Sequence, residues 1–460
     1  MLFSSIPFLF YFLPAALGLY FLAPRRMKNG VLLFCSLFFY GWGEPKYLLL
    51  MLFSIVQGYA FGLLIEKFRR RAKLFLTLSV AVSLLLLGYF KYADFFLDSF
   101  RAVTGLSVPA LNIALPIGIS FYTFQILSYV VDVYRRDTPA QRNFIDLAAY
   151  ISMFPQLIAG PIVRYTDIAA QLKTRSHTLS GAAAGIRRFI LGLAKKILLA
   201  NVLGQLVSHF QAAQSPDVLY HWLYAVAFLL QIYFDFSAYS DMAIGLGRIL
   251  GFSFPENFDY PYCAASITEF WRRWHISLGS WFRDYLYIPL GGSRVGRARL
   301  LCNLLIVWAA TGLWHGAAWN FVLWGLFYAV LLIAEKLWLL PRLKKHPALG
   351  HVYTLLLVML GFVLFDAPDA GTALSRIAGL VYAPQAVSAE SLYYLGSYAV
   401  VLVLALFAAT PLPKRLAARL SERLPRLTAI LEPVVLVVLL AVCTAYLVDG
   451  SFNPFLYFRF

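Results

Sequence analysis

The stretch at residues 300–334, LLCNLLIVWAATGLWHGAAWNFVLWGLFYAVLLIA, decides the architecture of this chain. It contains no Lys, Arg, Asp or Glu, and as a single helix it would be about 52 Å long at a rise of ~1.5 Å per residue. That length is too great for one crossing of a hydrocarbon layer of roughly 30 Å and too small for two crossings. Both flanks are basic, so the chain should return to the side from which it entered. We therefore predict a helical hairpin that is broken at TGLWHG, residues 311–316.

The break of this hairpin carries an ionisable side chain, His315. Each arm would extend roughly 22 Å from the cytoplasmic side as a helix, which places His315 near or past the middle of the bilayer. An ionisable group at that depth is costly and is by default a candidate functional residue. The alternative is a structural histidine that is bonded to a backbone carbonyl.

The rest of the chain has the composition of an integral membrane protein. Of its 460 residues, 61% are hydrophobic and 13% are charged, and the mean hydropathy is +0.72, whereas a soluble domain carries about 25% charged residues. We expect an all-α integral membrane protein with about a dozen crossings, forming one membrane domain over residues 1–460. The apolar runs that predict helical spans lie at residues 5–23, 47–65, 74–90, 219–236, 352–365, 391–409 and 431–447.

The net charge of +17 is mostly a signal of membrane topology. If the N-terminus lies outside, all but five of the 39 Lys and Arg residues fall on the cytoplasmic side, as the positive-inside rule requires. This distribution argues against a nucleic-acid partner and leaves anionic lipid or phosphate contacts as a second use of the charge. The five Lys and Arg residues that do not fall on the cytoplasmic side are Lys46, Lys91, Arg101, Arg376 and Arg459.

The four cysteines lack metal-ligand spacing, so we expect no metal site.

A second interruption of the span pattern lies at residues 145–165, IDLAAYISMFPQLIAGPIVRY. The segment is apolar but both of its flanks are basic, and Pro155, Gly160 and Pro161 interrupt any helix. A re-entrant or buried segment fits this pattern better than a span. Because irregular backbone at membrane depth must lie against protein or a wet cavity, we expect the segment to line one.

A second histidine, His275, lies in the aromatic and basic sequence TEFWRRWHISL, residues 268–278. The pattern suits an amphipathic segment at the membrane surface, and an ordinary surface helix is an equally good interpretation. Arg272 and Arg273 could meet the phosphates of lipids or of a donor substrate. Two neutral imidazoles at one cavity would supply a base near neutral pH and an orienting partner, which suits the acylation of an alcohol by a thioester.

Two carboxylates, Asp235 and Asp241, lie inside the apolar sequence QIYFDFSAYSDMAIGLGR, residues 231–248. They could mark a path for protons or ions, or they could form caps and hydrogen bonds with Tyr239 and Ser240. The chain contains no nucleophile elbow, phosphate-binding loop or zinc-protease motif that would indicate another chemistry.

Together these segments resemble the membrane-bound O-acyltransferase family, and within it the bacterial alginate O-acetyltransferase branch. The matching segments follow one another in the same order and cover most of the chain. They are FPQLIAGPIVRY (154–165), GLAKKILLAN (192–201), QIYFDFSAYSDMAIGLGR (231–248), FPENFDYPYCAASITEFWRRWHISLGSWFRDYLYIPLGG (254–292), TGLWHGAAWNFVLWG (311–325) and NPFLYFRF (453–460).

The resemblance implies a fold and a site. The fold would be a ring of about 11–13 tilted helices, with re-entrant and interfacial helices, around a central tunnel, and we place the catalytic core at about residues 110–340. The histidine of the GLWHG motif is the essential catalytic residue of the family, here His315, and the histidine of EFWRRWH is the second signature position, here His275. The residues that we expect to line the site or tunnel are Trp274, Arg273, Trp271, Trp314, Asn257, Tyr239 and Asp235.

The resemblance also implies substrates and partners. It predicts no bound cofactor, an acyl thioester such as acetyl-CoA as the cytoplasmic donor, and an exported or cell-surface polysaccharide as the acceptor. A hydrolase-like (SGNH) extracytoplasmic partner would complete the transfer, and the protein would lie in the bacterial inner membrane among its lipids. The alternatives are D-alanyl or other acyl transfer to teichoic acid or another envelope polymer, transport of a lipid-linked sugar, and a noncatalytic scaffold. The sequences AGPIVR (159–164) and FLYFRF favour the acetyl-transferring branch.

One segment departs from the family pattern. At residues 361–366, GFVLFD, Phe362 replaces a Trp that is frequent in the family, and Asp366 stands where an Arg is usual. The departure puts in doubt contacts on the outer face with a particular partner or polymer, and leaves the catalytic core unaffected.

The topology can be tested by labelling single cysteines in an otherwise cysteine-free chain. Cysteines that replace Lys67 and Lys414 should react with a membrane-impermeant maleimide only from the cytoplasmic side, because both positions lie in basic loops. A cysteine at Lys46 is the matched control and should react from outside. Labelling of position 67 or 414 in intact cells would contradict the predicted orientation.

Overall fold

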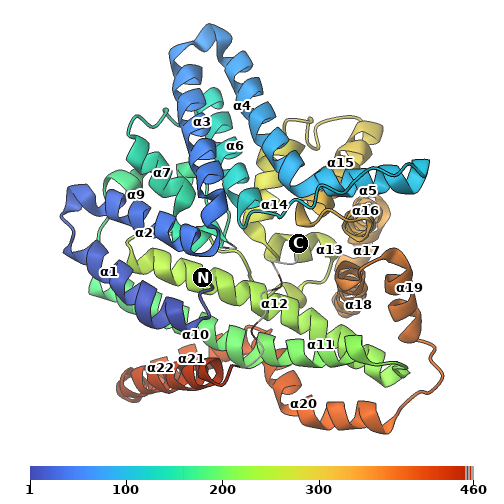
Figure 1. Cartoon of the computed structure of the whole chain (residues 1–460). Helices are drawn as coiled ribbons and strands as arrows, with labels where there is room; N and C mark the ends of the chain where they lie inside the picture. The colour runs from blue at the N-terminus through green and yellow to red at the C-terminus, as the bar shows by residue number, and fades with distance from the viewer. Residues whose placement is uncertain (159, 451–452, 454–455, 457–460) are drawn as a thin grey trace. The chain divides into compact units, whose positions relative to one another are not determined.

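The computed structural model describes residues 1–158, 160–450, 453 and 456 (Figure 1). Every regular element within these residues is a helix, which confirms the all-α prediction. Eight described helical segments are long and apolar enough to cross a membrane, so the protein is a multi-span membrane protein. The first predicted span forms a shorter apolar helix, Pro7–Leu22, and the larger number of crossings and the ring around a tunnel stay predictions. The eight segments are Pro45–Lys67, Arg69–Thr104, Leu179–Ala212, Val218–Ile249, Trp319–Lys345, Pro347–Asp366, Ala389–Ala408 and Pro425–Val448.

The chain forms two compact units, and two of the three boundaries between them fall inside helices, α10 (Leu179–Ala194) and α12 (Val218–Ile249). One unit comprises Met1–Phe189 and Met242–Pro255, and the other comprises Ile190–Asp241 and Glu256–Phe460. The expectation of a single membrane domain stays a prediction.

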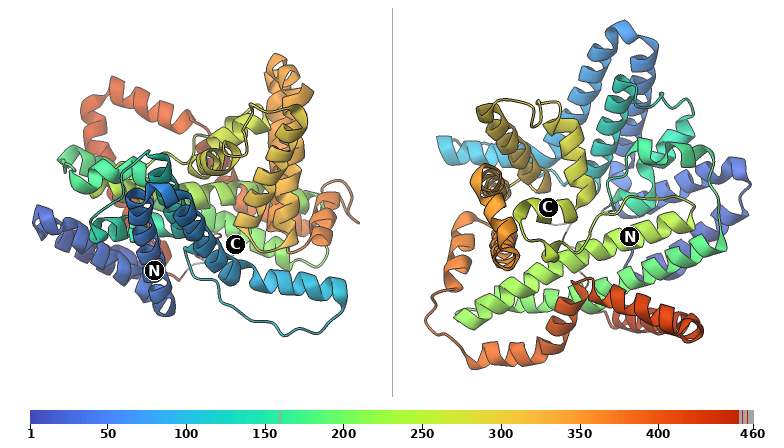
Figure 2. Two further views of the ribbon diagram at one scale, coloured as in Figure 1. Left: turned by 90° about the horizontal axis from the view of Figure 1, so that it is seen from above. Right: turned by 180° about the vertical axis from the view of Figure 1, so that it is seen from behind.

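The first unit is built around three helices that pack on one another, α3, α4 and α6. The hairpin of α3 and α4 is drawn in blue (Figures 1 and 2). Gln57 on α3 donates through Nε2 to the Ser83 hydroxyl on α4 at 3.0 Å, and its Oε1 accepts from the Ser79 hydroxyl at 3.2 Å. These buried hydrogen bonds join the two helices. The helices of this unit are α1 (Leu13–Leu22), α2 (Lys28–Gly43), α3 (Leu48–Lys67), α4 (Ala72–Leu87), α5 (Ala93–Thr104), α6 (Ile119–Arg135), α7 (Phe144–Ser152), α8 (Phe154–Leu157) and α9 (Tyr165–Lys173).

The interrupted segment at residues 145–165 forms two short helices, α7 and α8, followed by extended chain. Nearly all of its described residues are buried, which confirms a buried rather than a spanning segment. Pro155 stands in the first turn of α8, where a missing N–H costs no helical hydrogen bond. The Phe154 N–H donates to the Ser36 hydroxyl at 3.1 Å, so α2 helps to hold the break.

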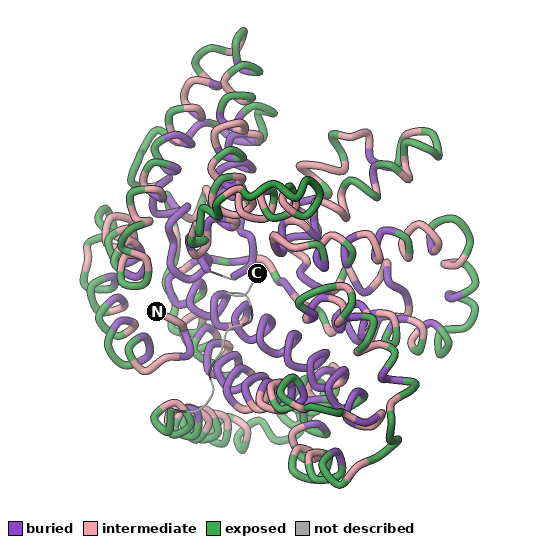
Figure 3. Tube along the Cα trace, turned by 45° about the vertical axis from the view of Figure 1, so that its right-hand side comes forward, coloured by how far each residue is buried: buried purple, intermediate pink, exposed green. Residues whose placement is uncertain are grey.

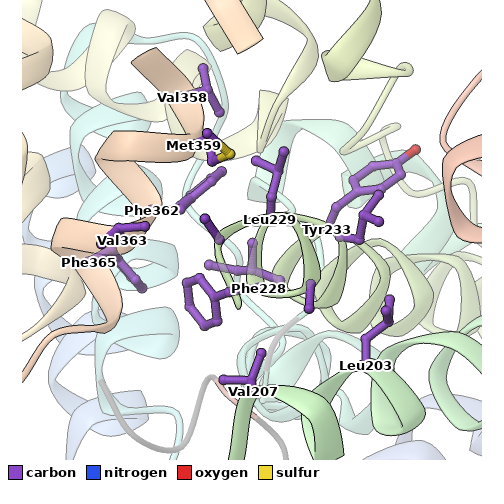
Figure 4. Close-up of a cluster of buried hydrophobic side chains, with 14 of the residues drawn as sticks. Leu203, Val207, Phe228, Leu229, Tyr233, Val358, Met359, Phe362, Val363 and Phe365 are labelled. Carbon is purple, nitrogen blue, oxygen red and sulfur yellow. The ribbon is translucent and has the colours of Figure 1, made fainter. Parts of the chain in front are cut away.

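In the second unit α12 forms the centre of the apolar core. Figure 4 shows Phe228, Leu229 and Tyr233 of α12 between side chains of α11 and α18. α12 is largely buried, whereas the apolar side chains of α22 are mostly exposed, as expected of a helix that faces lipid (Figure 3). The helices of this unit are α11 (Val202–Ala212), α13 (Ile267–Arg273), α14 (Ile276–Phe282), α15 (Arg297–His315), α16 (Trp319–Ala334), α17 (Leu340–Lys345), α18 (Pro347–Asp366), α19 (Ala370–Gly379), α20 (Ala389–Ala408), α21 (Leu412–Arg423) and α22 (Pro425–Val448).

The uncharged stretch at residues 300–334 forms the predicted hairpin, with α15 packed on α16. The helix continues through residues 311–314, so the break lies at residues 316–318, at the end of the predicted motif, and His315 is the last residue of α15. Two glycines allow the close contact of the two backbones. A Cβ on Gly312 would collide with the carbonyl of Phe321, and one on Gly325 with the carbonyl of Trp308.

We expect Gly325→Ala to lower the free energy of unfolding by about 1–3 kcal/mol, because the added methyl group meets backbone that cannot move aside as a side chain can. Thermal unfolding of the purified protein in detergent measures the change. Gly396→Ala, in the middle of α20 with no atom near the added methyl group, is the matched control and should leave the melting temperature unchanged or raise it. Equal effects of the two substitutions would contradict the backbone contact.

Candidate functional site

His275 lies between two short helices, at the first turn of α14. It is 1% exposed, and its backbone is in the left-handed region at φ +44°. A residue with a Cβ adopts this conformation at a cost of about 1–2 kcal/mol, and such residues persist where the surroundings fix them. The left-handed backbone ends α13 and turns the chain into α14.

Asn257 fixes both the turn and the imidazole. Its backbone carbonyl accepts from the N–H of Ile276 at 3.0 Å, and its side-chain Oδ1 accepts from the backbone N–H and the hydroxyl of Ser277 at 3.2 and 2.9 Å. The Asn257 Nδ2 donates to Ser240 Oγ at 3.0 Å, which leaves Oδ1 as an acceptor for His275 Nδ1 at 3.1 Å. His275 therefore carries its proton on Nδ1 and keeps the lone pair of Nε2 as an acceptor.

His315 lies among aromatic rings at the C-terminal end of α15. Its ring centroid is 5.0 Å from that of Trp314, 5.1 Å from that of Trp324 and 5.4 Å from that of Phe365. The residue is buried. These neighbours come from α15, α16 and α18, so three helices fix the position of the imidazole.

The two histidines share one aromatic neighbour. The ring of Trp314 is in contact with both, at 6.0 Å from His275 and 5.0 Å from His315 between centroids. Burial, and after it the charge of His315, lower the pKa of His275 well below its usual range. His275 is therefore neutral at neutral pH, as an acceptor or base requires. The structure brings the two predicted histidines to one indole ring, and their joint catalytic role stays a prediction.

A cavity of about 430 Å³ opens beside His275. Trp271 and Trp274, both predicted site residues, line it, and so do four residues of α15, Leu304, Val307, Trp308 and Thr311. The remaining lining is partly polar and basic, and includes Thr268, Arg272, Ser280, Arg283 and Tyr287. The cavity therefore joins a cationic and hydroxylated wall to an aromatic wall and to His275.

A second, much smaller cavity of about 20 Å³ lies beside His315. Trp274 lines this cavity as well as the large one, so both cavities border the same residue. The small cavity is lined by Ile232, Asp235, Phe236, Trp274, His315, Trp324, Phe362, Phe365 and Leu456.

Four of the predicted lining residues belong to neither cavity lining. Two of them, Trp314 and Asn257, contact the imidazoles instead. Arg273 forms an ion pair with Glu269 at 2.7 Å and donates to the Asp259 carbonyl, so its charge helps to close the turn before α13. Tyr239 is buried on α12 and belongs to neither cavity lining. Its neighbour Arg272 lines the large cavity instead, because helical spacing turns it to that side, and Arg283 lines the same cavity.

Asp235 and Asp241 are held by two consecutive lysines, a pairing that the sequence analysis did not include. Lys196 meets Asp235 at 2.6 Å with both side chains at most 4% exposed, and Lys195 meets Asp241 at 2.7 Å with 33% and 19% exposed. The second oxygen of Asp235 accepts from the backbone N–H of Leu456 at 2.9 Å. Residues 453 and 456 are the described part of the C-terminal sequence NPFLYFRF, whose other residues lie outside the described chain.

The departure at Asp366 is also explained by a contact within the chain. Arg376 of α19 donates to the Asp366 carboxylate at 2.9 Å, and Gln211 and Tyr224 donate to the same oxygen at 2.8 and 2.6 Å. This buried cluster fixes the end of α18 next to Phe365, whose ring touches His315.

Several residues of the site carried no signal in the sequence. Trp308 and Trp324 occur in apolar spans, where an aromatic residue in a core and one in a cavity wall look alike. Lys196 is one of the basic residues that the charge pattern places on the cytoplasmic side, and it is buried. Its position next to an aspartate that is distant in sequence could have been found only from paired variation among related sequences.

Comparison with known proteins identifies the family to which this chain is similar. Residues 134–365 match the model of the membrane-bound O-acyltransferase family. The chain is 41% identical to a probable alginate O-acetylase of Azotobacter vinelandii over 100% of both chains. It is 47% identical to a probable alginate O-acetylase of Pseudomonas aeruginosa, over 81% of this chain and 73% of the relative. It is 35% identical to a peptidoglycan O-acetyltransferase of Helicobacter pylori, over 83% of this chain and 80% of the relative.

We expect Lys196→Met to destabilise the protein by about 3–5 kcal/mol, because it leaves the Asp235 charge buried without its partner. Combining it with Asp235→Asn should restore much of the loss. Lys195→Met, which breaks the exposed pair, is the matched control and should cost no more than about 1 kcal/mol. Melting temperatures of the four proteins measure these differences, and equal losses from the two lysine variants would contradict the assignment.

Proposed function

Because the chain belongs to the membrane-bound O-acyltransferase family, we propose that His275 and His315 form the centre at which it transfers an acetyl group. The protein is an acyltransferase, and its reaction is the O-acetylation of a cell-surface polysaccharide. The single observation that carries the assignment of the site is the contact of both imidazoles with Trp314, while each imidazole lines a cavity.

The roles follow from the surroundings of each imidazole. His315 acts as the general base, which removes the proton of the acceptor hydroxyl while its oxygen attacks the thioester carbonyl. The C–S bond then breaks, and the thiolate leaves with the proton that His315 has taken up. His275, held by Asn257 and kept neutral by burial, orients or polarises the reacting groups through Nε2. Charge develops only at the carbonyl oxygen and at His315, so a fixed neutral neighbour avoids a second buried cation.

The large cavity suits the donor. An acyl thioester carries an extended pantetheine arm that ends in phosphate, and Arg272 and Arg283 supply cationic groups to the wall that also contains His275. The volume of about 430 Å³ lies within the usual range for a ligand site, ~300–1,000 Å³. We assign acetyl-CoA as the donor, bound from the cytoplasmic side.

The acceptor side is assigned from the relatives. Probable alginate O-acetylases of Azotobacter vinelandii and Pseudomonas aeruginosa are similar over most of this chain, which favours an exported polysaccharide of the alginate kind. The setting is the bacterial inner membrane, with an extracytoplasmic partner of the SGNH-hydrolase type completing the transfer to the polymer. Two side chains that could have met such a partner, Asp366 and Arg376, are engaged with each other.

D-Alanyl transfer to teichoic acid is the second candidate, and it is the weaker one. The teichoic acid D-alanyltransferase of Bacillus subtilis is 26% identical over 56% of this chain, below the identity and coverage of the acetyl-transferring relatives. The two functions differ in donor and product, so mass spectrometry of the polymer separates them. D-Alanyl esters on the polymer and no acetyl esters would overturn the assignment.

We expect His315→Ala to reduce polymer acetylation by about 10²–10⁴-fold, since the reaction loses its base. His275→Ala should cause a severe loss that is incomplete, because the base is still present. Acetyl esters on the polymer, measured in cells that express each variant at equal level in the membrane, provide the measurement.

His346→Ala is the matched control, since His346 is exposed and lies at the start of α18. It should acetylate as well as the wild type does. Near-normal acetylation by a stable His315→Ala protein would remove His315 from the mechanism. A transporter would survive the loss of His315 and consume no thioester, so hydrolysis or transfer of acetyl-CoA by the purified protein excludes both transporter and scaffold.

A further inference from the structure

The small cavity beside His315 has room for one small chemical group. Its volume is about 20 Å³, and a water-sized sphere needs about 10–15 Å³ on this scale. A methyl group is of similar size, whereas each further methylene of an acyl chain would need additional space. The large cavity, at about 430 Å³, imposes no such limit.

Apart from Asp235 and His315, the residues that line the small cavity are apolar or aromatic. Ile232 and Phe236 come from α12, Phe362 and Phe365 from α18, and the indole of Trp274 completes the enclosure. The charged group in the lining is Asp235, whose two oxygens are engaged by Lys196 at 2.6 Å and by the Leu456 N–H at 2.9 Å. An apolar group is therefore stable in this space, and a polar group without a partner is not.

We propose that this cavity binds the methyl group of the acetyl donor and that Phe362 limits the length of the acyl chain. The proposal rests on the proposed function, and it adds a subsite and a residue that determines specificity. With the methyl group in the small cavity, the carbonyl carbon lies beside His315 and the sulfur points past Trp274 into the large cavity, where the pantetheine arm fits. Trp274 lines both cavities, so the thioester would pass along its edge.

Phe362 is the residue best placed to set the limit. It is 2% exposed, and its ring is 5.0 Å from that of Trp274 and 6.4 Å from those of Phe365 and Phe270. Figure 4 shows it pointing from α18 toward the side chains of α12. Its aromatic neighbours hold the ring, so it cannot turn away to admit a longer chain without disturbing them.

The same walls discriminate against a D-alanyl group. Such a group carries an ammonium on the carbon that bears its methyl, and an ammonium in this cavity would lie against aromatic and aliphatic walls. The Asp235 carboxylate that could pair with it is already bound on both oxygens. Burying a charge without a free partner is strongly unfavourable, so the cavity selects a short acyl group that is also uncharged.

The experiment compares acyl donors of different chain length. It uses the full-length protein in membranes that contain its polymer acceptor. Acetyl-, propionyl- and butyryl-CoA are supplied in turn, and the acyl esters on the polymer are quantified by mass spectrometry. Phe362→Ala should raise the ratio of butyryl to acetyl transfer by about tenfold or more, since one methylene in an apolar pocket changes selectivity by about 10–200-fold. Ile232→Ala enlarges the opposite wall and should raise the ratio in the same direction.

Met359→Ala is the matched control. Met359 is buried on the same helix and in the same apolar core, but it does not line the cavity, so its substitution should leave the ratio unchanged. If Phe362→Ala and Ile232→Ala both transfer acetyl groups and both keep the wild-type ratio of butyryl to acetyl transfer, the methyl pocket is overturned while the proposed function stands. If the wild-type protein transfers no acetyl from acetyl-CoA, the proposed function itself is overturned. An equal rise of the ratio in Met359→Ala would show general loosening of the core and would also overturn the pocket.

Discussion

The requirement that each buried backbone N–H and C=O be hydrogen-bonded inside the chain governs this molecule. Where water is absent, helices meet that requirement by themselves, and a helix can end only where other groups take over. Both histidines lie at such ends. His315 closes α15, and His275 opens α14. At the second of these points Asn257 replaces the missing helical partners, since its two oxygens receive the N–H groups of Ile276 and Ser277. The residue that repairs the break is also the one that orients the imidazole.

The sequence was sufficient to predict the elements whose cause is local. The absence of charge over residues 300–334, between basic flanks, predicted the hairpin, and its length placed the break within a turn of its position in the structure. The bonds of Asn257 and Lys196 could not be predicted in this way, because each partner is brought close by tertiary packing. We expected Arg273 to line the site, and Arg272 lines the cavity instead. The two residues are adjacent in the sequence, and only the phase of a short helix decides which one faces the cavity.

The lysine pair links the site to the core of its unit. Two consecutive lysines bind two aspartates that are six residues apart on α12, about 9 Å along its axis. The inner pair lies at the wall of the small cavity and is shielded from solvent, so its charges cannot separate without a large desolvation cost. α12 therefore cannot slide along its axis without breaking both pairs. Phe236 follows Asp235 in the sequence, and its ring lies 4.6 Å from that of His275 between centroids, so this contact depends on the fixed register.

The glycine contact of α15 and α16 has a consequence for motion. Helices that meet through side chains can adjust their separation by rotamer changes within nanoseconds, whereas helices whose backbones touch have no such freedom. The hairpin should accordingly open as one cooperative unit, and its amide protons should exchange with solvent together rather than residue by residue. Fluctuations that admit a substrate to His315 must then arise in the segments around the hairpin. His315 is therefore held by the rigid hairpin, and the segments that surround the hairpin supply the motion.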